Sequence, residues 1–289
     1  MKTSELFQEK TVLSYEVFPP KTADDAHTIY EALDGLKEVT PDFISVTYGA
    51  GGGTNCAKTL EIATAVKHQY KIESVAHLRG IDLSKQEVLR IIGELKENGI
   101  ENVLALRGDV MPDTVPTGEF QYADELVAYI CEHSDLNILA ACYPEGHPEC
   151  DSIAKDIEHL KRKTDAGASQ LITQFFLDNE DFYRFLERTQ AAGINIPIQA
   201  GIMPVTNRKS VERMVKMCGI KLPKKFMRIM DRYEQNPAAL RDAGIAYAIE
   251  QIIDLLAHDV DGIHLYIMNK PYTAKKIYDA IRNIIRNCQ

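Results

Sequence analysis

Polar side chains stand at the ends of most of the short apolar runs of this 289-residue chain. Side chains of these types could bind a ligand and transfer protons. Glu16 lies inside SYEVF, His77 lies next to the end of ESVAHL, and Asp109 follows Arg107 in ALRGD. Carboxylates and imidazoles serve as general acids and bases, and guanidinium groups suit phosphate oxygens. Polar residues also follow or end other runs: Thr47 with Tyr48, Tyr143 with His147, Gln174, and Tyr266 with Asn269 and Lys270.

Each of these residues taken alone also has a purely structural explanation. Burying an isolated Glu16 without a partner is costly, and a lone His77 is more often a hydrogen-bonded core residue than a ligand. Arg107 and Asp109 could form a plain ion pair. The glycines at 51–53 lack the Gly-Lys-Ser/Thr of a phosphate-cradling loop, so they predict only a turn. The arrival of such groups at the same end of successive strands is what indicates a site.

The runs that carry these residues recur with the rhythm of strands alternating with helices. Eight β-branched or aromatic runs occur, and the first seven start about 30 residues apart, the length of one strand, one helix and two loops. They span residues 12–18, 43–47, 73–78, 102–107, 138–143, 170–175, 196–202 and 262–268. Between two of them, Ser84 and Glu87 match a capping box, and Gly99 predicts where that helix ends.

Eight such units predict an α/β fold, a closed (β/α)8 TIM barrel with apolar strands. Extra helices are expected near 207–218, 222–232 and 237–257, before the last strand. An open doubly wound sheet is the structural alternative, but no Gly-x-Gly-x-x-Gly turn follows an early strand. Because no linker-like stretch divides the chain, residues 1–289 are expected to form a single catalytic domain with its site at the carboxyl ends of the strands.

Composition narrows the classes of function. The chain has 33 basic and 42 acidic residues and a net charge of −9, which disfavours nucleic-acid binding and favours small molecules. Six scattered cysteines without a Cys-x-x-Cys pair or matched histidine spacing predict reduced thiols and no metal site. No apolar stretch approaches the roughly 20 residues of a membrane helix, and no signal-like run opens the chain, so we expect a cytoplasmic protein without membrane contact.

A charged helix is predicted after the fifth run. Asp156, His159, Arg162 and Lys163 are three, four or seven residues apart and therefore share one helix face. A solvated surface explains that face about as well as a site does. If the face turns toward the barrel mouth, Arg162 and Lys163 suit a phosphorylated cofactor.

Nine segments in order resemble the methylenetetrahydrofolate reductase family, in its short bacterial form consisting of the catalytic barrel alone. They are SYEVFPPKT, FISVTYGAGGGT, HLRGID, ALRGD, YPEGHPE, LKRKTDAGA, ITQFF, GIMPVTN and HLYIMNK. The resemblance implies a homo-oligomeric flavoprotein of one-carbon metabolism and methionine biosynthesis. It would bind FAD, take hydride from NADH or NADPH, and reduce 5,10-methylenetetrahydrofolate to 5-methyltetrahydrofolate, with the two substrates binding in turn.

The resemblance also implies roles for individual residues. Glu16 matches the general acid, and Gln174 and Lys270 fall where folate and nicotinamide are held, together with Thr47 and Asp109. Lys270 replaces an arginine of some members, His159 an asparagine, and Met214 lies near a phenylalanine that packs on the nicotinamide cofactor, so the choice between NADH and NADPH stays open. The positions implied to line FAD are Thr47, Tyr48, Ala50, His77, Arg107, Gly108, Asp109, Tyr122, Ala123, Tyr143, His147, Asp156, His159, Arg162 and Lys163.

The implied reaction requires a proton. The imidazolidine ring of the folate must open to an electrophilic iminium before hydride arrives, so its leaving nitrogen must be protonated. Glu16 can supply that proton if an apolar strand end disfavours its charged form. Asp109 would disfavour extra negative charge on the reduced flavin, and Arg107, Arg162 and Lys163 are candidates for the pyrophosphate and ribityl groups.

Three competing interpretations remain. A barrel that transfers the folate methyl group would lack flavin and depend on cobalamin proteins, whereas a flavin barrel of the proline dehydrogenase type would oxidise an amino acid. A non-enzymatic barrel is disfavoured by the crowded polar strand ends.

Overall fold

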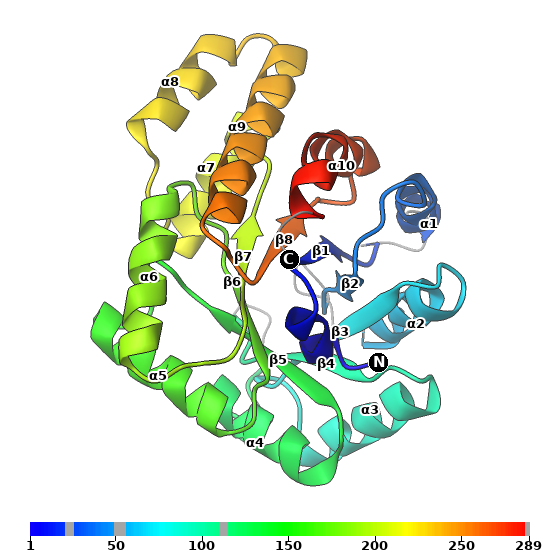
Figure 1. Ribbon diagram of the computed structural model, residues 1–289. Helices are drawn as coiled ribbons and strands as arrows, with labels where there is room; N and C mark the ends of the chain where they lie inside the picture. The colour runs from blue at the N-terminus through cyan, green and yellow to red at the C-terminus, as the bar shows by residue number, and fades with distance from the viewer. Residues whose placement is uncertain (21–25, 49–55, 110–114, 287–289) are drawn as a thin grey trace.

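The computed structural model describes residues 1–20, 26–48, 56–109 and 115–286, and its parallel strands close into a barrel in chain order (Figure 1). The strands are β1 (Val12–Val17), β2 (Phe43–Val46), β3 (Glu73–Arg79), β4 (Asn102–Leu106), β5 (Asn137–Cys142), β6 (Gln170–Thr173), β7 (Ile198–Ile202) and β8 (Gly262–Tyr266). Since β1 pairs with both β2 and β8, the sheet has no edge. The predicted (β/α)8 barrel is confirmed.

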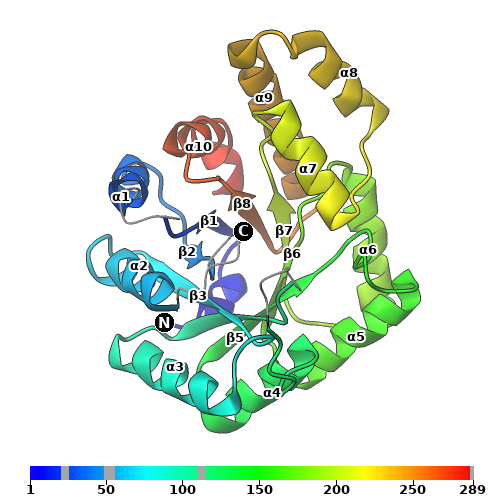
Figure 2. The same cartoon turned by 180° about the vertical axis from the view of Figure 1, so that it is seen from behind.

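Helices alternate with the strands and surround them (Figures 1 and 2). They are α1 (Ala26–Gly35), α2 (Cys56–His68), α3 (Lys85–Glu97), α4 (Ala123–His133), α5 (Ile153–Asp165), α6 (Asn179–Ala191), α7 (Arg208–Cys218), α8 (Lys224–Tyr233), α9 (Pro237–Ala257) and α10 (Pro271–Ile285). The predicted capping box of α3 forms between Ser84 and Glu87. Gly99 follows α3 with a φ of 69°, a left-handed conformation that suits glycine. In the part of the chain that the structure describes, no helix is long and apolar enough to cross a membrane.

Side chains of each strand alternate between the helices and the barrel interior. On β1, Leu13, Tyr15 and Val17 belong to the large core shared with the surrounding helices. Val12 instead belongs to a separate interior core with residues of β2 to β6, namely Phe43, Val75, Leu104, Leu139 and Ile172. Because side chains on a strand repeat with a period of two, Ser14 and Glu16 share the inward face of Val12. Glu16 is therefore placed inside the barrel, near the carboxyl ends of the strands.

The three extra helices stand between β7 and β8, as the sequence predicts. Asn207 caps α7 and Asn236 caps α9, whereas α8 begins only after Pro223, two residues later than expected. These helices cover a second apolar core, which consists of Phe175, Leu177, Met203, Val205, Val211, Ile220, Phe226, Met230 and Leu240. In both views α8 and α9 project beyond the ring of the other helices (Figures 1 and 2).

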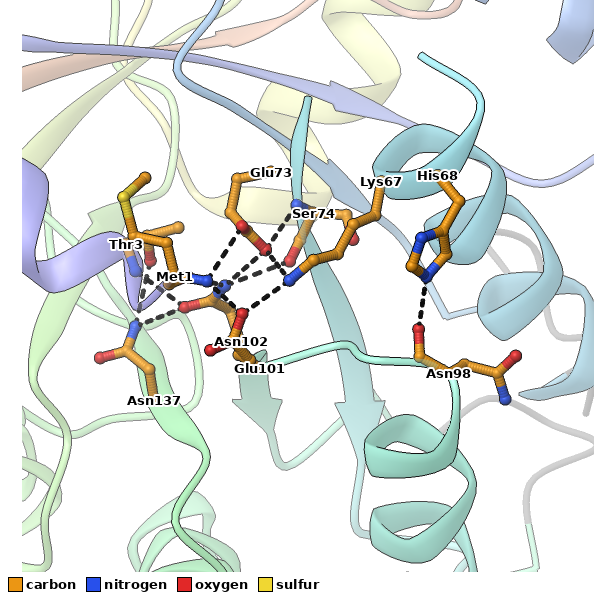
Figure 3. A network of polar contacts seen from close by, with 10 residues as sticks. All are labelled: Met1, Thr3, Lys67, His68, Glu73, Ser74, Asn98, Glu101, Asn102 and Asn137. Carbon is orange, nitrogen blue, oxygen red and sulfur yellow. Dashed lines mark hydrogen bonds and ion pairs between the residues drawn. The ribbon is translucent and has the colours of Figure 1, made fainter. Parts of the chain in front are cut away.

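A short 3-10 helix, η1 (Thr3–Gln8), lies across the amino ends of the strands and was not predicted. Leu6 joins the interior core, and the backbone N–H of Thr3 donates to Asn102 Oδ1 at 2.8 Å. Asn137 Nδ2 donates to both Thr3 Oγ1 and Asn102 Oδ1 at 3.0 Å (Figure 3). Nearby, Lys67 Nζ bridges the carboxylates of Glu73 and Glu101. Protein side chains therefore fill the amino end of the barrel.

Replacing Asn137 with alanine should destabilise the protein. The amide of Asn137 also accepts hydrogen bonds from Ser4 and Ser169, so the change removes four hydrogen bonds, two of them between buried side chains. We expect the free energy of unfolding, measured by urea titration, to fall by about 2–4 kcal/mol. The exposed Asn195 provides the matched control, since Asn195→Ala should cost about 0.5 kcal/mol or less. Equal unfolding midpoints for the two variants would contradict a structural role for the η1 network.

Candidate functional site

Glu16 lies at the centre of a buried polar cluster. Its side chain is 16% exposed, and its Oε2 atom lies 3.7 Å from Nε2 of His77 on β3 and 3.9 Å from Nε2 of His264 on β8. Both imidazoles are buried, and neither Nε2 atom has a hydrogen-bond partner. The sequence predicted apolar surroundings for Glu16. The structure instead turns two imidazoles toward one of its carboxylate oxygens.

Burial determines the charge of His77. It lowers the pKa of the imidazole from 6.5 to about 4, because the charged form is poorly solvated, although the neighbouring Glu16 opposes the shift. His77 is therefore neutral at pH 7 and contributes a dipole, rather than a full charge, to the cluster.

The side chain of Tyr266 packs beside the imidazole of His264 and is held in place by a hydrogen bond. Its hydroxyl donates to the backbone oxygen of Thr173 at 2.7 Å, and its ring stands at 85° to the imidazole of His264. Gly201 makes room for this ring, because a Cβ there would lie 2.9 Å from Cε2 of Tyr266. Burial raises the pKa of the Tyr266 hydroxyl well above its ordinary value, so the side chain stays neutral.

The ends of β2, β3 and β4 pack around an arginine that the sequence analysis did not select. Arg79 pairs with Asp82, and its guanidinium carbon lies 5.5 Å from the ring centroid of Tyr48. Gly108 has a φ of 93°, and a Cβ there would overlap the stem of Arg79. Gly108 is thus needed for both its backbone conformation and its close packing. Thr47 Oγ1 is buried here without a partner, whereas Ala50 lies outside the described residues.

Arg107 at the end of β4 forms an ion pair that the sequence did not predict. Its Nη1 atom lies 2.6 Å from the Glu149 carboxylate, and its Nε atom donates to the carbonyl of Gly108. Asp109, the partner considered from sequence, is exposed. Burial, and next the charge of Asp109, raises the pKa of the half-buried Tyr143. The ring of Tyr143 packs edge-on against His147, with 4.6 Å between the centroids. Burial, followed by the charge of Arg107, lowers the pKa of His147.

The two cationic side chains on the charged face of α5 lie in different environments. Lys163 is half-buried, its Nζ atom donates to the backbone oxygen of Ala141 on β5 at 2.5 Å, and burial lowers its pKa. Arg162 is exposed, lies over the ring of Tyr122, which precedes Ala123 at the start of α4, and pairs with Asp124. Of the two cations that the sequence treated alike, only Lys163 reaches the strands.

Three residues around the start of α5 have a donor set that could hold a cation. Ligand atoms of Cys150, Asp156 and His159 all lie within 4.8 Å of one another. A thiolate, a carboxylate and an imidazole are ligands that zinc accepts. Cysteine spacing alone does not indicate this group, which forms because Asp156 and His159 are one helical turn apart and Cys150 lies just before the helix. Asp156 also accepts a hydrogen bond from the backbone N–H of His147 at 3.2 Å.

Loops after β6, β7 and β8 complete the rim. The side-chain oxygen of Gln174 accepts from the backbone N–H of Phe175, and Lys270 Nζ donates to Thr206 Oγ1 at 2.9 Å. Asn269 holds the end of β8 against β1, because its amide accepts from the N–H of Phe18 at 3.0 Å and donates to the Phe18 carbonyl at 2.9 Å. The backbone just after Glu16 is therefore fixed against the end of β8.

Sequence reasoning missed the polar residues beneath Glu16. Ser14, Gln199 and His264 are fully buried and hydrogen-bonded in a line across β7, β1 and β8. The signal was present as alternation, since Ser14 is two residues before Glu16 and His264 is two before Tyr266. Because Ser14 and His264 stand before the ends of their runs, polar strand ends alone do not indicate them.

Comparisons with known proteins agree with one another. A family model described as methylenetetrahydrofolate reductase matches residues 2–282. The chain is 35% identical over 263 residues to 5,10-methylenetetrahydrofolate reductase of Pectobacterium carotovorum, covering 91% of this chain and 87% of that protein. The Escherichia coli K12 enzyme of the same name is 35% identical over 258 residues, with coverage of 89% and 86%.

Two further comparisons define the extent of the likeness. Methylenetetrahydrofolate reductase 1 of Schizosaccharomyces pombe is 36% identical over 281 residues, but the chain spans only 46% of its length. A solved structure has a TM-score of 0.69 at 13% identity and 97% coverage of both chains; it is described as an uncharacterized protein from Clostridium thermocellum that binds two copies of 5-methyl-5,6,7,8-tetrahydrofolic acid. At 13% identity, the likeness to this solved structure shows a similar fold and nothing further.

The buried neutral His77 predicts a loss of stability in acid. Its folded pKa of about 4 lies below the value of 6.5 for the free side chain, so the unfolded chain binds more protons between these values. This contribution to the free energy of unfolding is complete above about pH 6.5 and should decrease by about 2 kcal/mol on going from pH 7 to pH 5. Urea titrations of wild type and His77→Phe at both pH values will measure it.

The variant without the imidazole should lose that part of the pH dependence. His133→Gln is the control, because His133 is exposed on α4, and this variant should keep the wild-type pH dependence. The same decrease in stability for wild type and His77→Phe would show that His77 is not held neutral.

Proposed function

Since this chain belongs to the methylenetetrahydrofolate reductase family, we propose that it reduces 5,10-methylenetetrahydrofolate to 5-methyltetrahydrofolate, with FAD as cofactor and NADH or NADPH as electron donor. The observation that carries the proposal is a carboxyl group, Glu16, held inside a barrel at the rim where such folds perform chemistry. The bacterial relatives carry the name of this reaction. The description of the Clostridium thermocellum structure names the methylated folate as its ligand, which favours the same substrate class.

The described part of the rim fits a flavin dinucleotide. Thr47 Oγ1 and His77 Nε2 are buried polar atoms without partners, and such atoms normally bind a ligand, water or protein group. Arg107 and Lys163 bring cationic groups to the ends of β4 and β5, where a pyrophosphate would find charge-assisted hydrogen bonds. When bound, FAD would accept hydride from the nicotinamide and deliver it to the folate. We propose that the remaining FAD-binding residues are Tyr48, Ala50, Gly108, Asp109, Tyr122, Ala123, Tyr143, His147, Asp156, His159 and Arg162.

Glu16 is the proposed proton donor. The reaction breaks one carbon–nitrogen bond of the imidazolidine ring, so the leaving nitrogen takes a proton while the methylene carbon becomes an electrophilic iminium. Hydride then reaches that carbon and gives the methyl group. The sum consumes methylenetetrahydrofolate, one NAD(P)H and one proton, and Glu16 provides the proton at the ring nitrogen.

Gln174 and Lys270 are the proposed contacts to the two substrates. They flank the rim from the ends of β6 and β8, and Lys270 is already drawn toward the β7 loop by its hydrogen bond to Thr206. Both side chains can hydrogen-bond neutral or anionic groups. In this proposal Thr47 and Asp109 contribute to the same binding place, where nicotinamide and folate alternate.

The family likeness also leads us to infer a cytoplasmic homo-oligomer. Sedimentation velocity of the purified protein would test the assembly state. A monomer at micromolar concentration would contradict the proposed homo-oligomer but not the proposed reaction.

The purified protein should be yellow. Anaerobic NADH or NADPH should bleach the flavin absorption, and methylenetetrahydrofolate should restore it, because the two half-reactions are separate. A yellow protein whose flavin absorption is bleached by neither nucleotide would mean that the electron donor is another molecule. A colourless protein that cannot be reconstituted with FAD would contradict the proposal and favour the flavin-free methyl-transfer barrel.

Glu16→Gln should separate the two half-reactions. The amide keeps the shape but cannot donate the proton, so reoxidation by methylenetetrahydrofolate should slow by about 10²- to 10⁴-fold, while reduction by NADH persists. Stopped-flow absorbance measures both rates on one preparation. Equal losses in the two half-reactions would mean that Glu16 is structural.

A further inference from the structure

Cys150, Asp156 and His159 bring three different ligand atoms together at the start of α5. One atom of each side chain lies within 4.8 Å of the other two. In a tetrahedral zinc site, bonds of about 2.0–2.3 Å place neighbouring ligand atoms roughly 3.3–3.8 Å apart. All three side chains are half-buried rather than packed in a core. Rotation about their side-chain bonds can therefore close the remaining gap, which is at most about 1.5 Å.

The backbone around these residues holds them in place. The side chain of Ser152 caps α5, and Asp156 and His159 are three residues apart, so they share one face of its first turns. The loop after β5 is tied to the same turn through His147, whose backbone N–H donates to Asp156 Oδ2 at 3.2 Å. The backbone N–H of Cys150 in turn donates to the His147 carbonyl at 2.9 Å. Cys150 and Asp156 are thus fixed to one another before any ion arrives.

The ligand atoms are available to a cation. Cys150 Sγ donates a weak hydrogen bond to the backbone oxygen of Ser152 at 3.4 Å, which is given up when the thiol loses its proton. The carboxylate of Asp156 accepts from His147 through one oxygen and has a second oxygen to offer. The imidazole of His159 lies beside the ring of Tyr122, with 6.1 Å between the centroids, and within the described ranges it forms no hydrogen bond.

The charges of the cluster match a divalent cation. A thiolate and a carboxylate supply two negative charges, and a neutral imidazole supplies a third ligand. Two neighbouring cations, Lys155 and Arg162, are each paired with an aspartate, Asp151 and Asp124 respectively, which reduces their repulsion of a metal ion. Thiolate and imidazole ligands favour zinc, whereas magnesium and calcium prefer oxygen ligands.

We propose that Cys150, Asp156 and His159 bind one Zn²⁺ ion, and that this ion and FAD exclude each other. The exclusion rests on the proposed function, because Asp156 and His159 are among the proposed FAD contacts. One carboxylate and one imidazole cannot bind a metal ion and the flavin nucleotide at the same time. Loading of the cofactor is therefore sensitive to zinc.

The test uses the tag-free full chain and Co²⁺, which occupies tetrahedral zinc sites and acquires a charge-transfer absorption band when a thiolate binds it. The flavin-free protein should bind one Co²⁺ with this band, and Zn²⁺ should displace it, whereas Mg²⁺ should not. Cys150→Ser should abolish the band. Cys131→Ser is the matched control, because Cys131 is exposed on α4, and this variant should keep the band.

The exclusion is measured on the same preparations. Saturating FAD should lower the apparent Co²⁺ affinity by about 10-fold or more, and Zn²⁺ should weaken FAD binding by the same factor, because linkage between two ligands is reciprocal. Flavin fluorescence in the filtrate of a Zn²⁺-treated sample reports the released cofactor.

His159→Asn separates the two ligands. The amide can still hydrogen-bond a flavin nucleotide, but it is a poor ligand for zinc. Loss of a supporting partner of a metal ligand already costs about 10- to 100-fold in affinity, so loss of the ligand itself should cost at least about 10-fold. Binding of FAD, followed by flavin fluorescence, should persist in this variant.

Three results would overturn the inference. A folded, flavin-free wild type without a thiolate band would remove the site, and a band that survives in Cys150→Ser would assign it to another cysteine. An apparent Co²⁺ affinity that FAD leaves unchanged or increases would remove the exclusion. A chain that binds Co²⁺ through Cys150 but never binds FAD would defeat the proposed flavin chemistry instead and leave the metal site standing.

Discussion

The pairing of β1 with β8 is the contact on which the site depends. It places segments about 250 residues apart side by side, with Ser14 opposite His264 and Glu16 opposite Tyr266. Gly262 permits this approach, because a Cβ there would lie 2.6 Å from the Val12 carbonyl and 3.0 Å from the Gln199 side chain. Closure of the barrel therefore does more than remove sheet edges. It creates the buried setting in which a carboxyl group and an imidazole from opposite ends of the chain meet.

Buried polar groups occur at both ends of the barrel. At the amino end, Thr3, Asn102 and Asn137 satisfy one another, and the result is a structural plug. Toward the carboxyl end, Thr47 Oγ1 and the Nε2 atoms of His77 and His264 have no partner. An unpaired buried polar atom costs about 1–3 kcal/mol, so a protein keeps such atoms where another molecule or a proton makes use of them. Because Ser74 Oγ and Gln170 Nε2 at the amino end also lack partners, an unpaired atom indicates a site only where other groups suited to a ligand surround it.

The sequence was sufficient for the periodic features and insufficient for those that depend on closure. Regular spacing predicted the strands, the capping box of Ser84 and the extra helices, because each is set by residues close together in the chain. The η1 plug, the Arg107–Glu149 pair and the Gln199–Ser14–His264 line join distant segments, and no local pattern encodes their partners. Glu16 was identified from sequence, but its environment was predicted as apolar because the histidines that face it come from other strands.

Charge at the rim follows local geometry rather than the net charge of −9. Arg107 and Arg162 are each neutralised by a neighbouring carboxylate, so a phosphate there must compete with Glu149 or Asp124. Lys163 instead donates to a backbone carbonyl and has its pKa lowered by burial. An anion placed beside Lys163 would favour the charged form of its amine and gain a cation without displacing an acidic side chain. Of these two neighbouring cations, the half-buried Lys163 is therefore better placed than the exposed Arg162 to bind an anion.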